Sequence, residues 1–196
     1  MNFYHQYQCP DWVLDEVLRE IKNINFSQNK NNLISNQEYK NKNLFNFFYN
    51  CLLDVRNKEF SENIDIYITS CWVNKTAKGQ KHHKHSHINS MLSGIFYLNS
   101  TNSGNTVFSM PNPWLYYEKT NVFKISKNSL VDHQHEIRPD KGKLIIFPSQ
   151  IEHFVKENES ETERYTIAFN TFFSGTIGEN TTTYLRLDKI KNISFL

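Results

Sequence analysis

The sequence of 196 residues predicts a mainly β fold of the α+β class, a β-sandwich or barrel supported by N-terminal helices. Three observations predict it: two helix-like stretches come first, many short strand-like segments follow, and aromatic residues are abundant, with 15 Phe, 10 Tyr and 3 Trp. Aromatic side chains favour strands and fill the cores of sheets. The length fits a single domain, 1–196, with residues 1–60 as a helical support and 61–196 as the β core.

Two helices are expected near the N-terminus. Residues 10–23 carry Pro at the start and an apolar stripe that includes Trp12 and Val17, which is typical of an amphipathic helix. Residues 43–57 predict a second helix, whose dense apolar positions favour packing against a sheet. Residues 24–41 between them are rich in Asn, Gln and Ser and are expected to form a loop.

Beyond residue 62 the pattern changes to short apolar or alternating segments separated by Gly, Pro, Asn and Ser. Each segment predicts a strand. The segments are IDIYITSCWV, GIFYLN, GNTVFSM, HEIRP, GKLIIFPS, HFVKEN and RYTIAFNTFF, and TTYLRL near the C-terminus fits one more strand.

Charge and cysteine content narrow the class of protein. The 22 basic and 20 acidic residues are interspersed and leave a net charge of +2, which does not give the basic footprint of a nucleic-acid binder. No stretch is long and apolar enough to predict a membrane span or a signal peptide. The three cysteines are widely spaced and indicate reduced thiols, so a soluble protein in the cytoplasm is expected.

A histidine-rich segment, KHHKHSH, suggests a metal site. In an extended chain His85 and His87 point to the same side, with backbone positions about 6.5 Å apart, so that both imidazoles can reach one ion. His153, which follows the buried-strand pattern GKLIIFPSQIE, is the best candidate for a third ligand. Two ligands close in sequence and one far away are typical of a facial triad, which leaves metal positions open for substrate and oxygen.

The alternative is a solvated pair of surface histidines, which the flanking lysines favour because cations repel a metal ion. We expect His82 and His83 on the surface. His133 and His135 repeat the same spacing, so spacing alone does not identify a ligand pair.

The segment RYTIAFNTFF favours the metal interpretation. As a strand it places Arg164, Thr166 and Asn170 on one face, opposite a strongly apolar face that is expected to pack against the core. A guanidinium inside a barrel needs an anion, and a carboxylate is its best bidentate partner. The alternative is an arginine at the rim, paired with one of the glutamates at positions 157, 159, 161 and 163. Tyr97 in GIFYLN is either a second donor to the same anion or a core tyrosine.

With these motifs the sequence resembles the iron(II)/2-oxoglutarate-dependent dioxygenase superfamily, particularly its prolyl-hydroxylase-like branch and small oxygenase-like proteins of phage and marine bacteria. The resemblance runs from about Trp72 to Phe173 and rests on His85-Ser-His87, SMLSGIFYLN, GKLIIFPSQIEH and RYTIAFN. It implies a double-stranded β-helix, that is, a jelly-roll or cupin-like fold.

The resemblance also implies roles for single residues. His85 matches the first metal-binding histidine, His153 the distal one, and Arg164 the basic residue that binds the distal carboxylate of 2-oxoglutarate. Tyr97 and Thr166 match further cosubstrate-binding positions, and Asn170 is counted with them. The sequence departs from the family pattern at His87, where Asp or Glu is usual, and Asn89 is a weaker candidate for that position.

The function implied is that of an iron(II)- and 2-oxoglutarate-dependent dioxygenase that hydroxylates a small-molecule or peptide substrate, which the sequence does not identify. Two alternatives remain. One is a three-histidine cupin-type dioxygenase that does not use 2-oxoglutarate, and the other is a non-catalytic jelly-roll binding module with structural zinc or no metal. Residues 109–138, rich in Pro and aromatic residues, are expected to form a lid over the substrate. The oligomeric state does not follow from the sequence.

Overall fold

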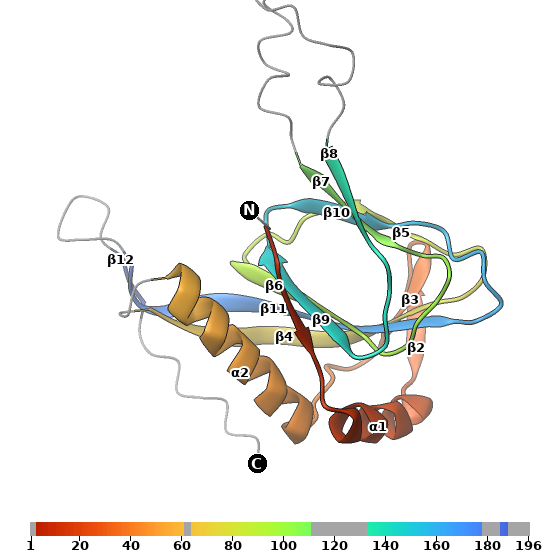
Figure 1. Ribbon diagram of the computed structural model, residues 1–196, viewed down its shortest axis with the longest axis horizontal. Helices are drawn as coiled ribbons and strands as arrows, with labels where there is room; N and C mark the ends of the chain where they lie inside the picture. Colours follow the sequence, from red (N-terminus) through yellow and green to blue (C-terminus); the bar gives the residue numbers. More distant parts are fainter. Residues whose placement is uncertain (1–2, 61–63, 111–132, 178–184, 188–196) are drawn as a thin grey trace, which may run out of the picture.

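The computed structural model describes residues 3–60, 64–110, 133–177 and 185–187, and the statements below concern these residues. They form two antiparallel sheets that face each other, with the helices on the outer side of the larger sheet (Figure 1). This arrangement is a double-stranded β-helix, or jelly roll, so the predicted fold class is confirmed. Most of the predicted lid, 111–132, lies outside the described residues.

The larger sheet has the order β1 (His5–Gln8), β9 (Lys143–Pro148), β6 (Leu92–Tyr97), β11 (Arg164–Ile177), β4 (Ile64–Thr76), β3 (Asn32–Ser35) and β2 (Phe26–Asn29), and β12 (Leu185–Leu187) pairs with β11. The smaller sheet has the order β5 (His82–His85), β10 (Glu152–Val155), β7 (Thr106–Met110) and β8 (His133–Ile137). The strands expected after residue 62 are therefore present among the described residues.

The two predicted helices are present, as α1 (Asp11–Glu20), continued by a 3₁₀ turn η1 (Ile21–Asn23), and α2 (Lys42–Glu59). The side chain of Asn41 caps α2, because its Oδ1 accepts a hydrogen bond from the Leu44 N–H at 2.8 Å. Its Nδ2 donates to Glu16 and Glu20 at 2.8 and 2.9 Å, which ties the start of α2 to α1.

The main core lies between the helices and the outer face of the larger sheet. Phe48 of α2 packs on Phe169 of β11, with ring centroids 4.7 Å apart. Ile167 and Phe169 are fully buried there, which confirms that the apolar face of this strand packs against the core. A second core, which includes Ile95, Phe108 and Phe147, fills part of the space between the two sheets.

Three expectations about the N-terminal third differ from the structure. Residues 24–41 are not simply a loop, because β2 and β3 form a hairpin that pairs with β4. Residues 5–8 form β1, which pairs with β9 and was not expected. Trp12 is 62% exposed rather than part of the buried stripe, since Val13, Val17 and Ile21, spaced by one helical turn, face the sheet instead. Whether the chain forms one domain stays a prediction.

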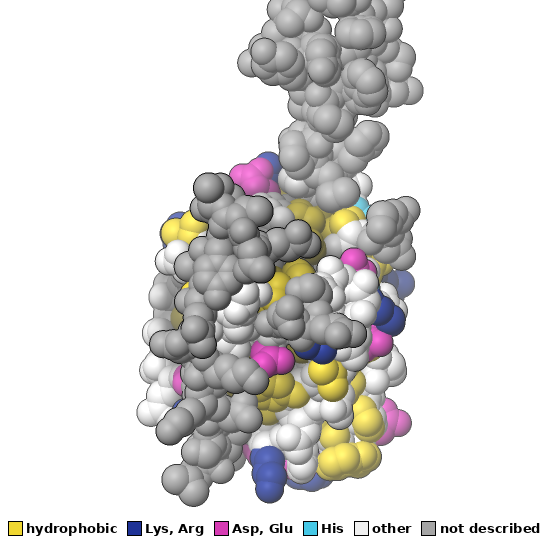
Figure 2. Space-filling view, turned by 90° about the vertical axis from the view of Figure 1, so that its left-hand side faces the viewer, with side chains coloured by type: hydrophobic (Ala, Val, Ile, Leu, Met, Phe, Trp, Pro, Cys, Tyr) yellow, Lys and Arg dark blue, Asp and Glu magenta, His cyan; other side chains and the backbone are white. Residues whose placement is uncertain are grey.

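The described helices are too short or too polar to cross a bilayer. On the face shown in Figure 2, basic and acidic side chains are scattered among hydrophobic ones. That distribution agrees with the small net charge of the sequence.

Candidate metal centre

Three imidazoles meet between the two sheets. His85 ends β5, His87 lies two residues further on, and His153 lies in β10 directly opposite His85 in the strand register. One nitrogen from each ring lies within 4.8 Å of the others. The Nε2 atoms of His87 and His153 are 3.4 Å apart, so the structure brings together the three residues that the sequence singled out.

Backbone carbonyls fix the orientation of two of these rings. Nδ1 of His85 lies 2.8 Å from the carbonyl oxygen of His83, and Nδ1 of His153 lies 3.0 Å from that of Ile151. A ring nitrogen facing a carbonyl oxygen donates its proton, so Nε2 of each ring carries the lone pair. The backbone N–H of His87 donates to the carbonyl of Ser149 at 3.0 Å, which anchors His87 to the turn before β10.

Burial keeps the imidazoles uncharged. Desolvation lowers the pKa of His153 to about 3 and that of His87 to about 4, and it also lowers the pKa of His85. At neutral pH the rings therefore offer lone pairs, the form in which histidine binds metals.

The spacing of the nitrogens fits a metal ion. Two nitrogens bound about 2.1 Å from one ion at a tetrahedral angle are about 3.4 Å apart. The Nε2 atoms of His87 and His153 show this separation, 3.4 Å. Imidazole ligands suit iron, zinc, copper and nickel, so the donor set is compatible with iron(II).

The other two histidines of the segment, His82 and His83, differ in their position relative to the cavity. His83 receives a hydrogen bond from Lys30 at 3.2 Å, and this cation disfavours a metal there, although its ligand nitrogen also lies within 4.8 Å of those of His82 and His85. His82 is not a free surface residue as expected, because it lines the same cavity as the three imidazoles. Between the pairs His85–His153 and His82–Val155, β5 has one residue more than β10, and this irregularity places His82 on the cavity side.

Arg164, the first residue of β11, lies at the bottom of this cavity and is only 2% exposed. One terminal nitrogen donates to Thr106 at 3.1 Å, and the guanidinium lies over the ring of Tyr97 at 5.3 Å from its centroid. Its Nε has no hydrogen-bond partner among the described residues. Burial lowers the pKa of Arg164, which is the expected result when a cation lacks a neighbouring carboxylate.

The alternative of a rim arginine paired with a nearby glutamate is wrong. Glu163 pairs with Lys75 at 2.7 Å, and Glu161 pairs with Lys78. Within the described part of the chain, no ion pair involves Arg164. Because an unpaired buried charge is costly, the site calls for an anionic ligand.

The predicted cosubstrate residues fall into two groups. Thr166 is buried and lines the cavity beside Arg164. Tyr97 does not line it, since its hydroxyl donates to Thr106 at 2.8 Å while its ring supports Arg164 from behind. Asn170 is also outside the lining, and its Oδ1 accepts a hydrogen bond from Ser93 at 2.9 Å where a bulge shifts the register after residue 170. A direct cosubstrate contact is therefore not supported for Tyr97 or Asn170.

Thr106 is a site residue that the sequence interpretation missed. Its hydroxyl accepts hydrogen bonds from both Tyr97 and Arg164 and is fully buried. The alternation of GNTVFSM puts Thr106 on the same inward face as Phe108, which is the signal that would have revealed it.

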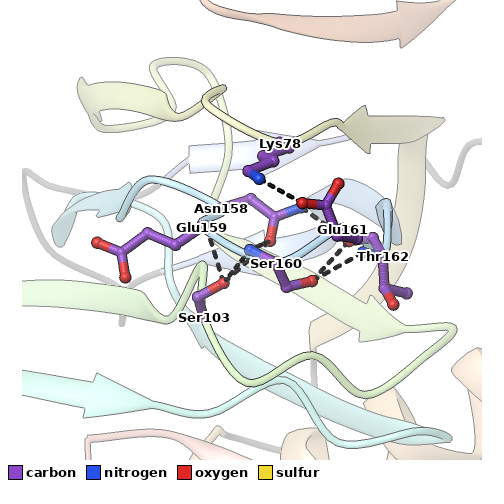
Figure 3. Close-up of polar contacts among 7 residues, drawn as sticks. All are labelled: Lys78, Ser103, Asn158, Glu159, Ser160, Glu161 and Thr162. Atoms are coloured by element: carbon purple, nitrogen blue, oxygen red, sulfur yellow. Dashed lines mark hydrogen bonds and ion pairs between the residues drawn. The ribbon is translucent and has the colours of Figure 1, made fainter.

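Asn158 organises the loop that leads into β11 (Figure 3). Asn158 is fully buried, its Nδ2 donates to the carbonyls of Thr76 and Thr162 at 3.0 and 2.9 Å, and its Oδ1 accepts from Ser103 at 3.0 Å. Gly104 lies against the same arginine, and a Cβ there would approach Arg164 Cδ to 3.2 Å.

The cavity is small, with a volume of about 40 Å³, and it opens to solvent. The imidazoles lie on the side of the smaller sheet, and Arg164 and Thr166 lie on the larger sheet. Trp72 lies near His87, with ring centroids 6.0 Å apart. No aspartate or glutamate of the described chain lines the cavity.

A jelly roll that holds clustered imidazoles beside a buried guanidinium belongs to the class of non-haem metal-dependent oxygenases. The particular family follows from the sequence, because a family model described as "Putative 2OG-Fe(II) oxygenase" matches residues 70–170. The chain belongs to this family, and its cofactors are iron(II) and 2-oxoglutarate. Comparison with curated proteins gives no match.

Several solved structures resemble the chain. A prolyl-4-hydroxylase from Pseudomonas putida has 14% identity and a TM-score of 0.58, over 87% of this chain and 93% of that one. HygX from Streptomyces hygroscopicus, with nickel and 2-oxoglutarate bound, has 10% identity and a TM-score of 0.61, over 86% and 82%. A prolyl hydroxylase from Trichoplax adhaerens, in complex with a hypoxia inducible factor oxygen degradation domain peptide fragment, has 18% identity and a TM-score of 0.59, over 88% and 84%. At these identities the likeness establishes the fold.

Proposed function

We propose that the protein is a hydroxylase in which His85, His87 and His153 hold iron(II) and Arg164 binds the distal carboxylate of 2-oxoglutarate. The observation that carries the proposal is the buried Arg164 without a carboxylate partner, on the same cavity as three uncharged imidazoles. A dicarboxylate that reaches across the cavity would bind the metal at one end and pair with this guanidinium at the other.

Each residue then has a physical task. The carbonyls of residues 83 and 151 hold His85 and His153 with Nε2 directed away from the backbone, so the ligands are oriented before the metal arrives. Thr106 and the ring of Tyr97 hold the guanidinium, while its Nε stays available to a carboxylate. Iron(II) and 2-oxoglutarate, when bound, would allow dioxygen to act as the oxidant, with one oxygen atom entering the substrate C–H bond as a hydroxyl group and the other entering succinate as carbon dioxide is released.

The two alternatives fit this cavity less well. A three-histidine dioxygenase without 2-oxoglutarate would leave Arg164 buried without an anion, which is unfavourable. A structural zinc site is closed by four protein ligands, whereas the group of His85, His87 and His153 offers three, and the neighbouring His82 groups instead with His83 and His85. The substrate, a small molecule or a peptide, is addressed below.

Anaerobic titration tests the proposal. Addition of iron(II) and then 2-oxoglutarate should produce a visible absorption band that requires both. The variant Arg164→Met should keep its affinity for iron(II) but need about 100-fold more 2-oxoglutarate, because a charge-assisted bidentate contact is lost.

The matched control is Arg138→Met, which removes an exposed arginine bonded to Asn102 away from the cavity. It should titrate as the wild type does. No band at saturating iron and 2-oxoglutarate would contradict the function, and an unchanged 2-oxoglutarate affinity in Arg164→Met would contradict the assignment of this arginine.

A further inference from the structure

The cavity has a second polar atom without a partner, at the end formed by the β2–β3 hairpin. Asn32, the first residue of β3, lines the cavity and is only 1% exposed. Its Oδ1 is buried and has no hydrogen-bond partner among the described residues. A buried amide oxygen without a donor is costly, so a ligand that supplies one would be stabilised there.

The neighbours of this amide indicate its orientation. Nδ2 of Asn32 faces the carbonyl of Leu33 at 3.5 Å and Oδ1 of Asn74 at 3.4 Å, both of which are acceptors. Exchange of the nitrogen and oxygen of the Asn32 amide would set oxygen against the Leu33 carbonyl, so the unpartnered atom is the oxygen. These two contacts are long, and most of the hydrogen-bonding capacity of the amide remains for a ligand.

2-Oxoglutarate is not that ligand. Its two carboxylates and its keto group are all hydrogen-bond acceptors at neutral pH, and an acceptor does not satisfy Oδ1 of Asn32. The group bound there has to carry an N–H or O–H donor.

The charge of the cavity further narrows the chemical class of the ligand that Asn32 binds. Imidazoles that bind a metal are neutral, and no acidic side chain of the described residues lines the cavity. Iron(II) and Arg164 together contribute three positive charges, and 2-oxoglutarate offsets two of them. A cationic amine would meet a net positive charge, so an uncharged donor is favoured.

We infer that Asn32 is a substrate-binding residue that accepts a hydrogen bond from an uncharged N–H or O–H group, such as an amide or a hydroxyl. The inference rests on the proposed function, because the reacting metal and 2-oxoglutarate supply the charge argument. The hairpin is held against the site, since Lys30 in its turn bonds His83 and the carbonyl of Asn31 accepts from the N–H of Lys81 at 3.2 Å.

The test uses the anaerobic complex of the whole protein with iron(II) and 2-oxoglutarate, whose visible band shifts when a compound binds next to the metal. Three sets of probes are titrated: N-acetyl amino-acid amides as neutral N–H donors, sugars and polyols as neutral O–H donors, and the amino-acid amides without the acetyl group as cations. We expect one of the two neutral sets to shift the band, and the set that does so distinguishes N–H from O–H recognition.

Variants of Asn32 complete the test. Asn32→Leu, which has a similar size and no acceptor, should raise the apparent Kd of the active probe about tenfold, for the loss of one hydrogen bond. Asn32→Asp keeps an acceptor and adds a negative charge, so it should bind the cationic amides better than the wild type does. Asn105→Leu is the matched control, because Oδ1 of Asn105 is also buried without a partner but does not line the cavity.

Equal probe affinity in Asn32→Leu and the wild type would overturn the inference, and so would a failure of every neutral probe to shift the band. In both cases the band itself would still form, so the proposed function would stand. Absence of the band with iron(II) and 2-oxoglutarate alone would instead overturn the proposed function.

Discussion

In the proposed metal site, His87 makes the set of three protein ligands electrically neutral. Its ring is largely desolvated, which lowers its pKa to about 4, and its Nε2 faces that of His153 at 3.4 Å. In the family pattern that the sequence resembles, a carboxylate stands at this position. Three neutral ligands leave the full positive charge of the metal for the anionic cosubstrate to offset, so cosubstrate binding should be strongly coupled to metal binding.

Removal of His87 should weaken the metal site. We expect His87→Ala to lower the affinity for iron(II) at least tenfold, because one of three nitrogen ligands is lost. Anaerobic calorimetry with iron(II) measures this change. His135→Ala serves as the control, since His135 is exposed and packs on Phe3 and Tyr4. Equal affinity for iron(II) in His87→Ala and the wild type would exclude His87 as a ligand.

In the absence of ligand, Arg164 should lower the stability of the folded protein. Its guanidinium is buried and lacks an anion, so replacement by an apolar side chain of similar length removes a desolvated charge. We expect Arg164→Met without ligands to have a melting temperature equal to or above that of the wild type. We also expect 2-oxoglutarate, added to the iron(II) complex, to raise the melting temperature of the wild type more than that of the variant. Differential scanning calorimetry of both proteins, with and without ligands, decides this, and a large loss of stability in the ligand-free variant would contradict the prediction.

Single residues were predictable where the strand period and the motif agreed. Spacing of two in an extended segment located His85 and His87, and the face of β11 located Arg164 and Thr166. The interpretation failed where a side chain acts through a neighbour, as Tyr97 and Thr106 do, because contacts across sheets leave no trace in local spacing.

At the scale of elements, Gly94 controls the fit of β6 against β11. The two strands pair with Gly94 opposite Phe169, and a Cβ at residue 94 would come within 2.1 Å of the Phe169 ring. That ring also packs on Phe48 of α2. The glycine therefore allows the ring to lie across the sheet beneath the helix.

The variant Gly94→Ala should lower the free energy of unfolding by about 1–3 kcal/mol, the usual cost of overpacking a core. Chemical denaturation measures the loss. The double variant Gly94→Ala/Phe169→Leu removes the ring that the new methyl group meets, so it should be less destabilised than the sum of the two single variants. Additive losses in the double variant would show that the clash does not occur.

Asn158 links the loop before β11 to β4. Asn158→Leu removes the Asn158 donor to the carbonyl of Thr76 and one of two side-chain donors to the carbonyl of Thr162. Because this loop leads into Arg164, we expect a lower melting temperature and weaker 2-oxoglutarate binding, with iron(II) affinity unchanged. The anaerobic band reports both affinities. Asn102→Leu, which loses a bond to the exposed Arg138, is the control. Loss of iron(II) affinity in Asn158→Leu would show that the loop supports the metal site as well.

The elements of the β core were predictable because their apolar runs are bounded by Gly, Pro and Asn. The β2–β3 hairpin was not, since both strands are four residues long and FSQN carries one apolar side chain. Its pairing depends on β4, which is far away in sequence. The exposure of Trp12 has a similar origin, because the sheet beneath α1 decides which face of the helix is buried.

For the whole molecule, the three cysteines report on the integrity of the main core. All three are free and buried, and desolvation raises the pKa of Cys9 and of Cys51 to about 12 and raises that of Cys71 further. A thiol reacts as the thiolate, so a raised pKa means that almost none is reactive at pH 8.

We expect a thiol reagent at pH 8 to modify the native protein very slowly and the urea-unfolded protein at three sites per chain. The reaction is followed by absorbance or by mass. One fast-reacting thiol in the native protein would show that the helices do not stay packed on the sheet.

The architecture as a whole was predictable from the order of the elements, helices first and strands afterwards, and from the residue pattern of each segment. The family resemblance supplied the topology. The sequence did not reveal that residues 1–60 add three strands to the larger sheet, because short polar strands become stable only at the edge of a sheet that is already formed.

The hairpin at that edge has a consequence for how such proteins diversify. It lies before the segment matched by the family model, 70–170, yet Asn32 forms part of the cavity wall. Under the inference that Asn32 binds the substrate, part of the selectivity lies outside the stretch of chain that carries the proposed metal ligands and Arg164. A graft of this hairpin from one relative onto another is then expected to alter which compounds are accepted and to leave the chemistry intact.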